Sequence, residues 1–392
     1  MPSLILTLNA GSSSVKFALF TCGPEPDLVA SGKVEQLGHD AQLLARWANE
    51  QVIDDCRMTL HSGQFHAVAF DAVFDLIRRC LPDAHIVAVG HRVVHGGIDY
   101  THPTLIDAQV LADLENLTPF APLHEPHNIR GIRAAGMSYK AVPQIACFDT
   151  SFHRQHPFVN DVFALPRRYY EQGVRRYGFH GLSYEYIANA LAQTLPEVSS
   201  GSVIVAHLGN GASMCGLKGG QSIASTMGFS ALDGLPMGTR CGEIDPGVIL
   251  YMLDNEGLSS GQISNILYKE SGLLGISGLS NDMRTLISSN SPAARQAVDY
   301  FVYRVRCELG GLAVALGGLD ALVFTGGIGE HQALVRERIC AQLEWLGVII
   351  DGSLNVKHAF DISAETSPVR VLVIPTNEEL VIARAVAKHL SG

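Results

Sequence analysis

The sequence predicts a mixed α/β protein of two related domains, and three observations support this fold class. Its 392 residues exceed the length at which one hydrophobic core stops growing, so two domains are expected. Short runs rich in Val, Ile and Leu alternate with amphipathic helical patterns, which is typical of α/β architecture. A strand, a turn of small residues and a returning strand occur near the N-terminus and again about half a chain later, which indicates two similar halves.

The expected strands are short apolar runs that end in Gly or polar residues. Two pairs of runs, at residues 4–9 with 15–20 and at residues 202–208 with 214–217, each flank a turn of small residues and predict hairpins. Further buried strands are expected at residues 86–94, 144–148, 321–325 and 369–374. Apolar positions three and four apart predict helices at residues 68–81, 184–195, 246–255, 293–316, 333–346 and 378–390.

No linker rich in Pro, Gly and Ser separates the halves, and the natural division follows the strand that ends at Asp149. Functional residues are expected in the polar and glycine-rich loops after the strands. A ligand is then expected in the cleft between the two halves, because pockets form preferentially between domains.

Composition and charge exclude several classes of protein. With 47% hydrophobic and 17% charged residues, the chain can bury sizeable cores and is not disordered. Lys and Arg total 28 against 38 Asp and Glu, and the formal charge of −10 would repel a phosphate backbone, so no nucleic-acid partner is expected.

Targeting signals and cysteine spacing also limit the interpretation. The most apolar stretch, residues 309–329, is interrupted by Asp320 and several glycines, which predicts no membrane span. The N-terminus has neither a basic flank nor a small-residue cleavage site, so a cytoplasmic location is expected. The eight cysteines include no C-x-x-C pair and are expected to be reduced packing residues.

Three glycine-rich or small-residue turns follow three of the expected strands, at residues 9–16, 209–211 and 325–330. Such turns can bind phosphate through backbone N–H groups, and the first also offers the Asn9 amide and the Lys16 ammonium. One such turn alone is equally well explained as an ordinary hairpin. Three of them favour a nucleotide site. The Gly32-Lys33 dipeptide lacks the rest of a Walker A loop, and no G-x-G-x-x-G follows a strand, so neither a P-loop nor a Rossmann site is supported.

Cationic and histidine side chains occur in the loops as a group. Arg92 and Arg240 each stand among glycines, and His124, His180 and His207 lie in similar polar loops. A single loop histidine or arginine is more often structural. The set as a whole, without Cys/His metal spacing, suits an anionic transition state better than a metal site.

Three polar side chains could complete this set. Asp149, Asn9 and Glu378 are candidates for holding Mg²⁺ and for orienting the cations, because carboxylate and amide oxygens are the ligands that Mg²⁺ accepts.

These loops resemble those of the acetate kinase family, within the larger superfamily of acetate and sugar kinases, heat-shock-chaperone ATPases and actin. Residues 9–16 (Asn-Ala-Gly-Ser-Ser-Ser-Val-Lys) resemble its opening phosphate motif, and residues 176–181 and 237–242 resemble its other signatures. Matches also occur at residues 90–97, 148–150, 207–211, 280–284, 324–330 and 375–379, so the resemblance covers the chain end to end.

The resemblance implies a two-domain actin-like ATPase fold with duplicated mixed sheets flanked by helices and an active-site cleft between the domains. The domains would be residues 1–149, on which a last helix at 380–392 packs back, and residues 150–379, which would bind nucleotide and form a homodimer. It implies reversible transfer of the γ-phosphoryl group of ATP to acetate, giving acetyl phosphate and ADP, with Mg²⁺ or Mn²⁺.

The resemblance also implies a role for each matched residue. Catalytic residues would be Asp149, Arg92, His180, Arg240 and His124, and the metal would bind at Asn9 and Glu378. The acid substrate would contact Arg92, Val94, Leu123, Phe179 and Ala231. The nucleotide would contact Ser12, Ser14, Lys16, His207, Leu208, Gly209, Asn210, Gly211, Asp282, Met283, Arg284, Gly326, Gly327, Ile328, Gly329 and Glu330.

Two positions depart from the family pattern. Glu125 stands where Asn is expected after His124, which would add a negative charge near the anion site. Ala231 stands where proline usually borders the acyl pocket, which would leave room for an extra methylene.

The expected mechanism is direct in-line transfer. A carboxylate substrate is already ionised near pH 7, so no general base is required, and Asp149 is expected to orient an arginine or a metal-bound water. Two alternatives stay open: a propionate or butyrate kinase with nearly the same motifs, and an ATP-driven binding protein of the heat-shock-chaperone or actin type. A carboxylate-dependent ADP-release assay would separate these classes.

Overall fold

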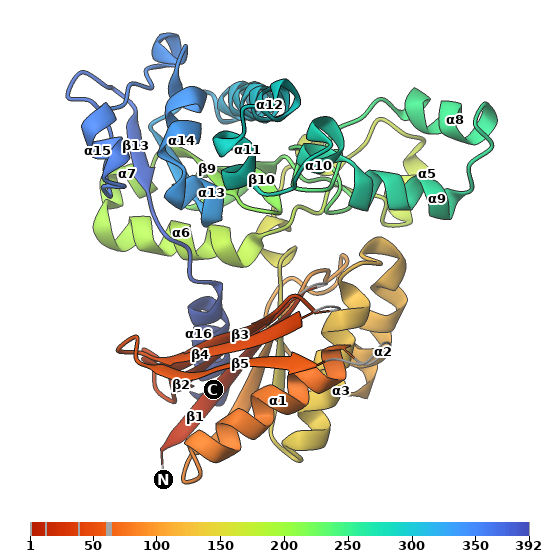
Figure 1. Ribbon diagram of the computed structural model, residues 1–392, viewed down its shortest axis with the longest axis vertical. Coiled ribbons are helices and arrows are strands. Elements are labelled where there is room, and N and C mark those ends of the chain that lie inside the picture. The colour runs from red at the N-terminus through yellow and green to blue at the C-terminus, as the bar shows by residue number, and fades with distance from the viewer. Residues whose placement is uncertain (1, 12–13, 38–39, 60–64, 392) are drawn as a thin grey trace. The chain divides into compact units, whose positions relative to one another are not determined.

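The computed structural model describes residues 2–11, 14–37, 40–59 and 65–391, and the chain forms two compact units. The first unit comprises Met1–Ser151 together with Asn377–Gly392, and the second comprises Phe152–Thr376. Each unit has one mixed β-sheet with helices packed against it (Figure 1).

The first unit contains eight strands in the order β5-β4-β3-β2-β1-β6-β8-β7. Its strands are β1 Ser3–Ala10, β2 Val15–Thr21, β3 Leu28–Glu35, β4 Asp40–Trp47, β5 Val52–Thr59, β6 His85–Val93, β7 Thr104–Leu105 and β8 Gln144–Phe148, and its α-helices are α1 Phe65–Cys80, α2 Ala108–Leu117, α3 Glu125–Ser138 and α16 Glu378–Ser391.

The second unit contains five strands in the order β11-β10-β9-β12-β13. Its strands are β9 Ser202–Leu208, β10 Ala212–Lys218, β11 Gln221–Ser225, β12 Ala321–Thr325 and β13 Arg370–Val373. Its α-helices are α4 Phe158–Asp161, α5 Arg167–Glu171, α6 Gly181–Thr194, α7 Pro196–Ser199, α8 Pro246–Asp254, α9 Ser260–Asn265, α10 Gly272–Ser277, α11 Met283–Ser288, α12 Pro292–Leu316, α13 Gly326–His331, α14 Ala333–Cys340 and α15 Gly352–Val356.

The two sheets share a five-strand core of the same topology, which confirms the expected relation between the halves. In the first unit β3, β2 and β1 pair antiparallel, and β6 and β8 continue the sheet parallel to β1. In the second unit β11, β10 and β9 pair antiparallel, and β12 and β13 continue parallel to β9. Strands β4, β5 and β7 extend the first sheet beyond this core.

Both faces of the first sheet are covered by helices because its central strands are apolar on both sides. Leu4, Leu6 and Leu8 point to one face and pack with Phe70 and Phe74 of α1. On the other face α16 lies so close to β6 that a Cβ atom on Gly90 would stand 2.4 Å from Ile382 Cγ2. Glycine at position 90 is therefore required by the close packing of this helix.

The second sheet is covered in the same way. Tyr184, Ile187 and Leu191 of α6 pack with Cys215 and Leu217 of β10 on one face. On the other face α12 approaches so closely that a Cβ on Gly216 would lie 3.2 Å from Leu316 Cγ. Side chains alternate along β10, so those of odd-numbered residues face α6 and those of even-numbered residues face α12.

Most expected elements are present, with shifted ends, and several others were not expected. The helix expected at 333–346 is wrong in its second half, because α14 ends at Cys340 and a short 3-10 turn, Glu344–Leu346, follows. The expected glycine-rich turn after β12 is also wrong in form, because Gly326 already begins α13. Strands β3, β4 and β5 were not expected, since only some of their alternate residues are buried.

No helix in the described ranges of the chain is both long and apolar enough to cross a membrane.

Candidate active site

Strand β6 places Arg92 beside the start of α16. Arg92 follows Gly90 by two residues and therefore lies on the same face of the sheet, which α16 covers. Thr7 of β1 pairs with Gly90, so Asn9 occupies the neighbouring position next to Arg92 on this face. Helix α16 begins at Glu378, and Asp149 directly follows β8, the parallel neighbour of β6. The carboxyl ends of three parallel strands thus bring these four side chains together.

Arg92 is held by this cluster through all three of its nitrogens. Its Nε donates to both carboxylate oxygens of Asp149 at 3.0 and 3.2 Å, and Nη2 donates to Asp149 Oδ2 at 2.6 Å. Nη1 donates to Asn9 Oδ1 at 3.2 Å, and Glu378 Oε2 lies 3.9 Å from Nε. Asp149 is 1% exposed. A nearly buried carboxylate therefore fixes the plane of the guanidinium group.

Electrostatics keep Arg92 fully charged. Burial alone would lower the pKa of its guanidinium, but the charges of Asp149 and Glu378 outweigh this effect and raise the pKa above its ordinary value. The cluster consequently presents a fixed cation flanked by two carboxylates and one amide oxygen.

Burial opposes the extra negative charge expected at Glu125. Its side chain is fully buried at the first turn of α3, and neither carboxylate oxygen makes a hydrogen bond of normal geometry with a described residue. Burial raises the pKa of Glu125 to about 8, with a further rise from the Asp149 charge and an opposing effect of the His95 backbone N–H. Desolvation therefore favours the neutral form of this carboxyl group at pH 7 over the charged form that the sequence suggested.

In the second unit the sheet brings His180 and His207 together. His180 precedes α6, His207 lies on β9, and their rings stack with centroids 4.4 Å apart and an interplanar angle of 21°. His180 Nδ1 lies 2.8 Å from Ser213 Oγ, and His207 Nδ1 lies 2.8 Å from Ser183 Oγ. Each ring is thus oriented by its own serine hydroxyl.

The glycine-rich loops of this unit pack against one another. Gly209 N donates to Gly211 O at 3.0 Å, and Gly238 N donates to Asn210 O at 3.1 Å, which links the β9–β10 turn to the Arg240 loop. Gly326, with φ +75°, comes so close to this turn that a Cβ atom there would lie 2.8 Å from Leu208 O. Glu330 Oε1 accepts from the backbone N–H of Gly326 at 2.9 Å. Two segments that the sequence suggested for nucleotide contact, residues 207–211 and 326–330, therefore pack against one another, and the Arg240 loop lies beside them.

Arg240 is anchored by the loop that it belongs to. Its Nη1 donates to Ala231 O at 2.9 Å, so the unusual Ala231 contacts this arginine through its backbone. Gly272, with φ +63°, packs against the loop so tightly that a Cβ there would lie 2.6 Å from Arg240 O. A side chain at position 272 would displace the Arg240 backbone.

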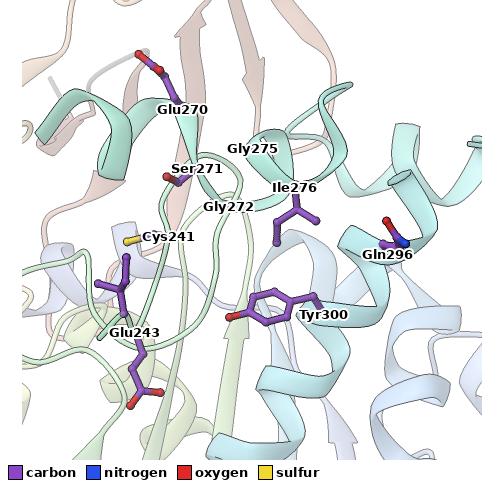
Figure 2. Close-up of a pocket in the computed structure, with 10 residues that line it drawn as sticks. Cys241, Glu243, Glu270, Ser271, Gly272, Gly275, Ile276, Gln296 and Tyr300 are labelled. Atoms are coloured by element: carbon purple, nitrogen blue, oxygen red, sulfur yellow. The ribbon is translucent and has the colours of Figure 1, made fainter. Parts of the chain in front are cut away.

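A cavity of about 710 Å³ borders the loop that carries Arg240. Figure 2 shows Tyr300 and Gln296 on one helix, with Tyr300 pointing toward the loop that carries Cys241 and Glu243. Ser271 and Gly272 form another part of its wall. The residues predicted for catalysis, nucleotide and acyl binding do not line this cavity, although Cys241 directly follows Arg240.

The remaining predicted residues have more varied positions. Asp282 caps α11 and pairs with the exposed Arg284, while Met283 is a buried core residue and offers no accessible side chain. Val94 and Phe179 are buried, Leu123 and His124 are half-buried before α3, Ser14 is half-buried and Lys16 is exposed on β2. Ser12 lies outside the described residues.

Several supporting residues were not predicted from the sequence. Ser213 contacts His180, and Tyr184 contacts Ser213. Asn128 accepts a hydrogen bond from Val94 N and donates one to Ala10 O. Arg336 is fully buried and donates to the carbonyl oxygens of Gly329 and Glu330. The only available signal was weak: polar residues that interrupt otherwise apolar helix and strand patterns.

Asn9 and Glu378 are the residues near Arg92 that were predicted to bind magnesium. Among the described residues no group of three or more His, Cys, Asp or Glu side chains is arranged to hold a metal ion. The Asn9 and Glu378 oxygens lie next to the same guanidinium group, at 3.2 and 3.9 Å. One amide and one carboxylate oxygen fit Mg²⁺, which typically takes one or two protein ligands and completes its shell with phosphate oxygens and water.

The duplicated sheets, the packed glycine-rich turns and the cation cluster around Arg92 fit an α/β phosphotransferase. Residues 4–384 match the acetokinase family. The chain belongs to the acetokinase family.

Similar proteins cover nearly the whole chain. An acetate kinase of Methylocella silvestris is 53% identical over 98% of this chain and 97% of its own. An acetate kinase of Rhodopseudomonas palustris is 50% identical over the full length of both. Among solved structures, a propionate kinase from Francisella tularensis superposes with a TM-score of 0.88 at 39% identity and covers 98% of each chain. The acetate kinase of Porphyromonas gingivalis gives 0.86 at 35% identity and covers 100% of each chain.

Proposed function

We propose that this enzyme transfers the γ-phosphoryl group of ATP reversibly to acetate, giving acetyl phosphate and ADP. Membership of the acetokinase family and the acetate kinases at 50 and 53% identity support this substrate pair. The observation that carries the proposal within this chain is the Arg92 guanidinium, which Asp149 and Asn9 hold in one orientation. Such a preorganised fork suits a carboxylate or phosphoryl group.

Asp149 acts in this proposal by orientation rather than by proton abstraction. Acetate is ionised near pH 7, so its oxygen can attack the phosphorus without losing a proton. Both oxygens of Asp149 are engaged with Arg92, which fits a positioning role. Arg92 and Arg240 would neutralise the carboxylate and the transferring group, and His180 would donate to an equatorial phosphoryl oxygen.

Asn9 and Glu378 would hold Mg²⁺ or Mn²⁺ together with the nucleotide phosphates. When bound, the ion would neutralise charge that develops on the phosphate oxygens. The nucleotide would contact the turn at residues 207–211, Asp282 to Arg284, and Gly326 to Glu330, with Ser12, Ser14 and Lys16 from the first hairpin.

A second acid remains a specific alternative, because the propionate kinase of Francisella tularensis is among the similar structures. A panel of acetate, propionate and butyrate, with the acyl phosphate trapped as its hydroxamate and ADP release measured in parallel, tests both. Acyl hydroxamate formed with none of the three acids would overturn the proposed activity.

A homodimer in the cytoplasm completes the proposal. Leu250 and Tyr251 of α8 are 58 and 55% exposed, and Tyr303 of α12 is 59% exposed; large apolar side chains left exposed in this way would be covered by a partner. Sedimentation velocity measures the oligomeric state. A single monomeric species would contradict the proposed homodimer.

Replacing Glu378 by glutamine is expected to raise the Mg²⁺ concentration needed for half-maximal activity while the melting temperature stays unchanged. The amide keeps the shape of the side chain but removes the charge that would attract the ion. Activity measured across a Mg²⁺ titration tests this, with the exposed Glu344→Gln as a matched control. An unaltered titration in Glu378→Gln would mean that Glu378 serves only the N-terminus of α16.

Replacing Ala231 by proline is expected to lower the propionate to acetate ratio of kcat/KM several-fold. If Ala231 borders the acyl group, its methyl leaves room that a proline ring would fill, and one methylene is worth about 0.8 kcal/mol. Proline retains the carbonyl oxygen that accepts from Arg240, so this anchor can persist. An equal loss with both acids would instead indicate a changed loop conformation.

A further inference from the structure

Three side chains on the α6 face of the second sheet form a connected polar chain. Ser213 lies on the same face of β10 as Cys215 and Leu217, which α6 covers. Tyr184 stands one turn after His180, so both side chains lie on the same side of the helix. Tyr184 Oη bonds Ser213 Oγ, and Ser213 Oγ lies 2.8 Å from His180 Nδ1.

Two of the three members of this chain are removed from water. Tyr184 and Ser213 are both fully buried, while His180 is half-buried at the helix start. His180 has φ +56°, a left-handed conformation that side chains other than glycine rarely adopt. This conformation is compatible with the hydrogen bond between Ser213 Oγ and His180 Nδ1, which holds the ring in place.

Burial decides the direction of the hydrogen bonds. Ser213 Oγ is the partner of the Tyr184 hydroxyl among the described residues, and burial raises the pKa of Tyr184 well above its ordinary value, so the phenol keeps its proton. If Ser213 donated to Tyr184, the phenolic proton would be left without an acceptor in the core, which is unfavourable for a buried donor. Tyr184 therefore donates to Ser213.

The single proton of Ser213 is then available for His180. A serine hydroxyl that accepts from Tyr184 still has one O–H to donate, and His180 Nδ1 is the ring nitrogen within reach. Nδ1 becomes the acceptor, and the neutral imidazole must carry its proton on Nε2. Nε2 faces the glycine turn, since a Cβ on Gly211 would lie 3.3 Å from it.

The neighbouring histidine uses a separate hydroxyl. His207 Nδ1 lies 2.8 Å from Ser183 Oγ, and its ring stacks on that of His180. Of the two histidine rings, the Tyr184 hydroxyl therefore influences only that of His180. A substitution at Tyr184 can thus change the hydrogen bonding of His180 without changing that of His207.

We propose that Tyr184 and Ser213 are positioning residues for phosphoryl transfer, which fix His180 as the Nε2–H tautomer so that it presents a hydrogen-bond donor to the phosphoryl oxygens. The inference rests on the proposed function for its effect on rate. The tautomer itself is a property of the folded enzyme and can be observed without turnover.

The test measures the ring ¹⁵N shifts of His180 in full-length enzyme labelled with ¹⁵N-histidine, with His180→Asn used to assign the signals. A protonated and an unprotonated ring nitrogen differ strongly in shift. Wild-type enzyme is expected to show a protonated Nε2 and an unprotonated Nδ1. Tyr184→Phe is expected to mix the two tautomers and to lower kcat about tenfold, with KM for ATP and acetate unchanged.

The matched control is Ser222→Ala, which removes another buried serine hydroxyl bonded to histidine rings, those of His153 at 2.8 Å and His156 at 2.7 Å. It should alter the His153 and His156 signals while the His180 tautomer and kcat stay as in the wild type. Ser213→Ala should reproduce the effect of Tyr184→Phe on the tautomer.

Several results would overturn the proposal: a protonated Nδ1 in wild-type enzyme, an unchanged tautomer in Tyr184→Phe, or a loss that appears only in KM. The wild-type spectrum decides the first point even where a variant does not fold. Wild-type enzyme that forms no acyl phosphate would overturn the proposed function, yet its spectrum would still report the tautomer.

Discussion

Arg92→Ala is expected to lower kcat/KM for phosphoryl transfer to acetate by about a hundredfold or more. Asp149 and Asn9 fix this guanidinium before the substrate arrives, so the interaction gained in the transition state requires little reorganisation. The variant also leaves the nearly buried Asp149 without its main partner, which disfavours the folded cluster. Steady-state kinetics, read together with the melting temperature, separate a catalytic loss from a folding defect.

Arg92→Lys should recover little of the lost activity, because a single ammonium group cannot replace the bidentate bond to Asp149 and the bond to Asn9. Arg240→Ala is expected to cause a loss of similar size. The control is Arg133→Ala, an exposed arginine of the same unit whose partner is Glu115, and it should leave kcat/KM unaltered. Near-normal kinetics in either Arg92→Ala or Arg240→Ala would remove that residue from the active site.

Glu125→Gln is expected to make the protein markedly more stable than the wild type at pH 8, with little difference at pH 4.5. The pKa of Glu125 is raised to about 8 by burial, against an ordinary value of 4.5. Below about pH 4.5 the carboxyl is protonated in the folded and the unfolded chain alike. Between these values the unfolded chain loses the proton that the folded chain retains, so the free energy of unfolding falls as pH rises, by about 1.4 kcal/mol per pH unit.

Urea unfolding of wild type and variant across pH 4.5 to 8 measures this effect as the difference between the two proteins. Other groups that titrate in this range contribute equally to both and cancel. Glu197→Gln provides the control, since this glutamate is exposed on α7 and its removal should leave the difference constant with pH. A pH-independent gap between wild type and Glu125→Gln would show that Glu125 is ionised in the folded protein.

Elements with strong local patterns were the ones that the sequence predicted well. The hairpin strands β1 and β2, the buried strands β8 and β12 and the long helix α12 are all present close to their expected ends. Each has either continuous apolar residues or a helical repeat, and these patterns follow from burial on two faces or on one. Strands β3, β4 and β5 escaped notice because half-exposed residues interrupt their apolar positions.

The sequence by itself identified Arg92, Asn9, Asp149 and Glu378 as candidates, because polar residues at strand ends and a family resemblance can be recognised without a structure. It could not say that these four side chains share one face of one sheet. That arrangement depends on parallel pairing of β1, β6 and β8, together with the packing of a helix from the far end of the chain.

What the sequence determined alone is the kind of protein: two duplicated α/β halves, their phosphate-type turns and the family. Only the tertiary structure shows in which direction the pKa of Glu125 shifts and which side chains contact His180. Both depend on burial, since the same glutamate would be charged in water and the same serine hydroxyl would bond to solvent. Exclusion of water is a property of packing between elements distant in the chain, and no local pattern records it.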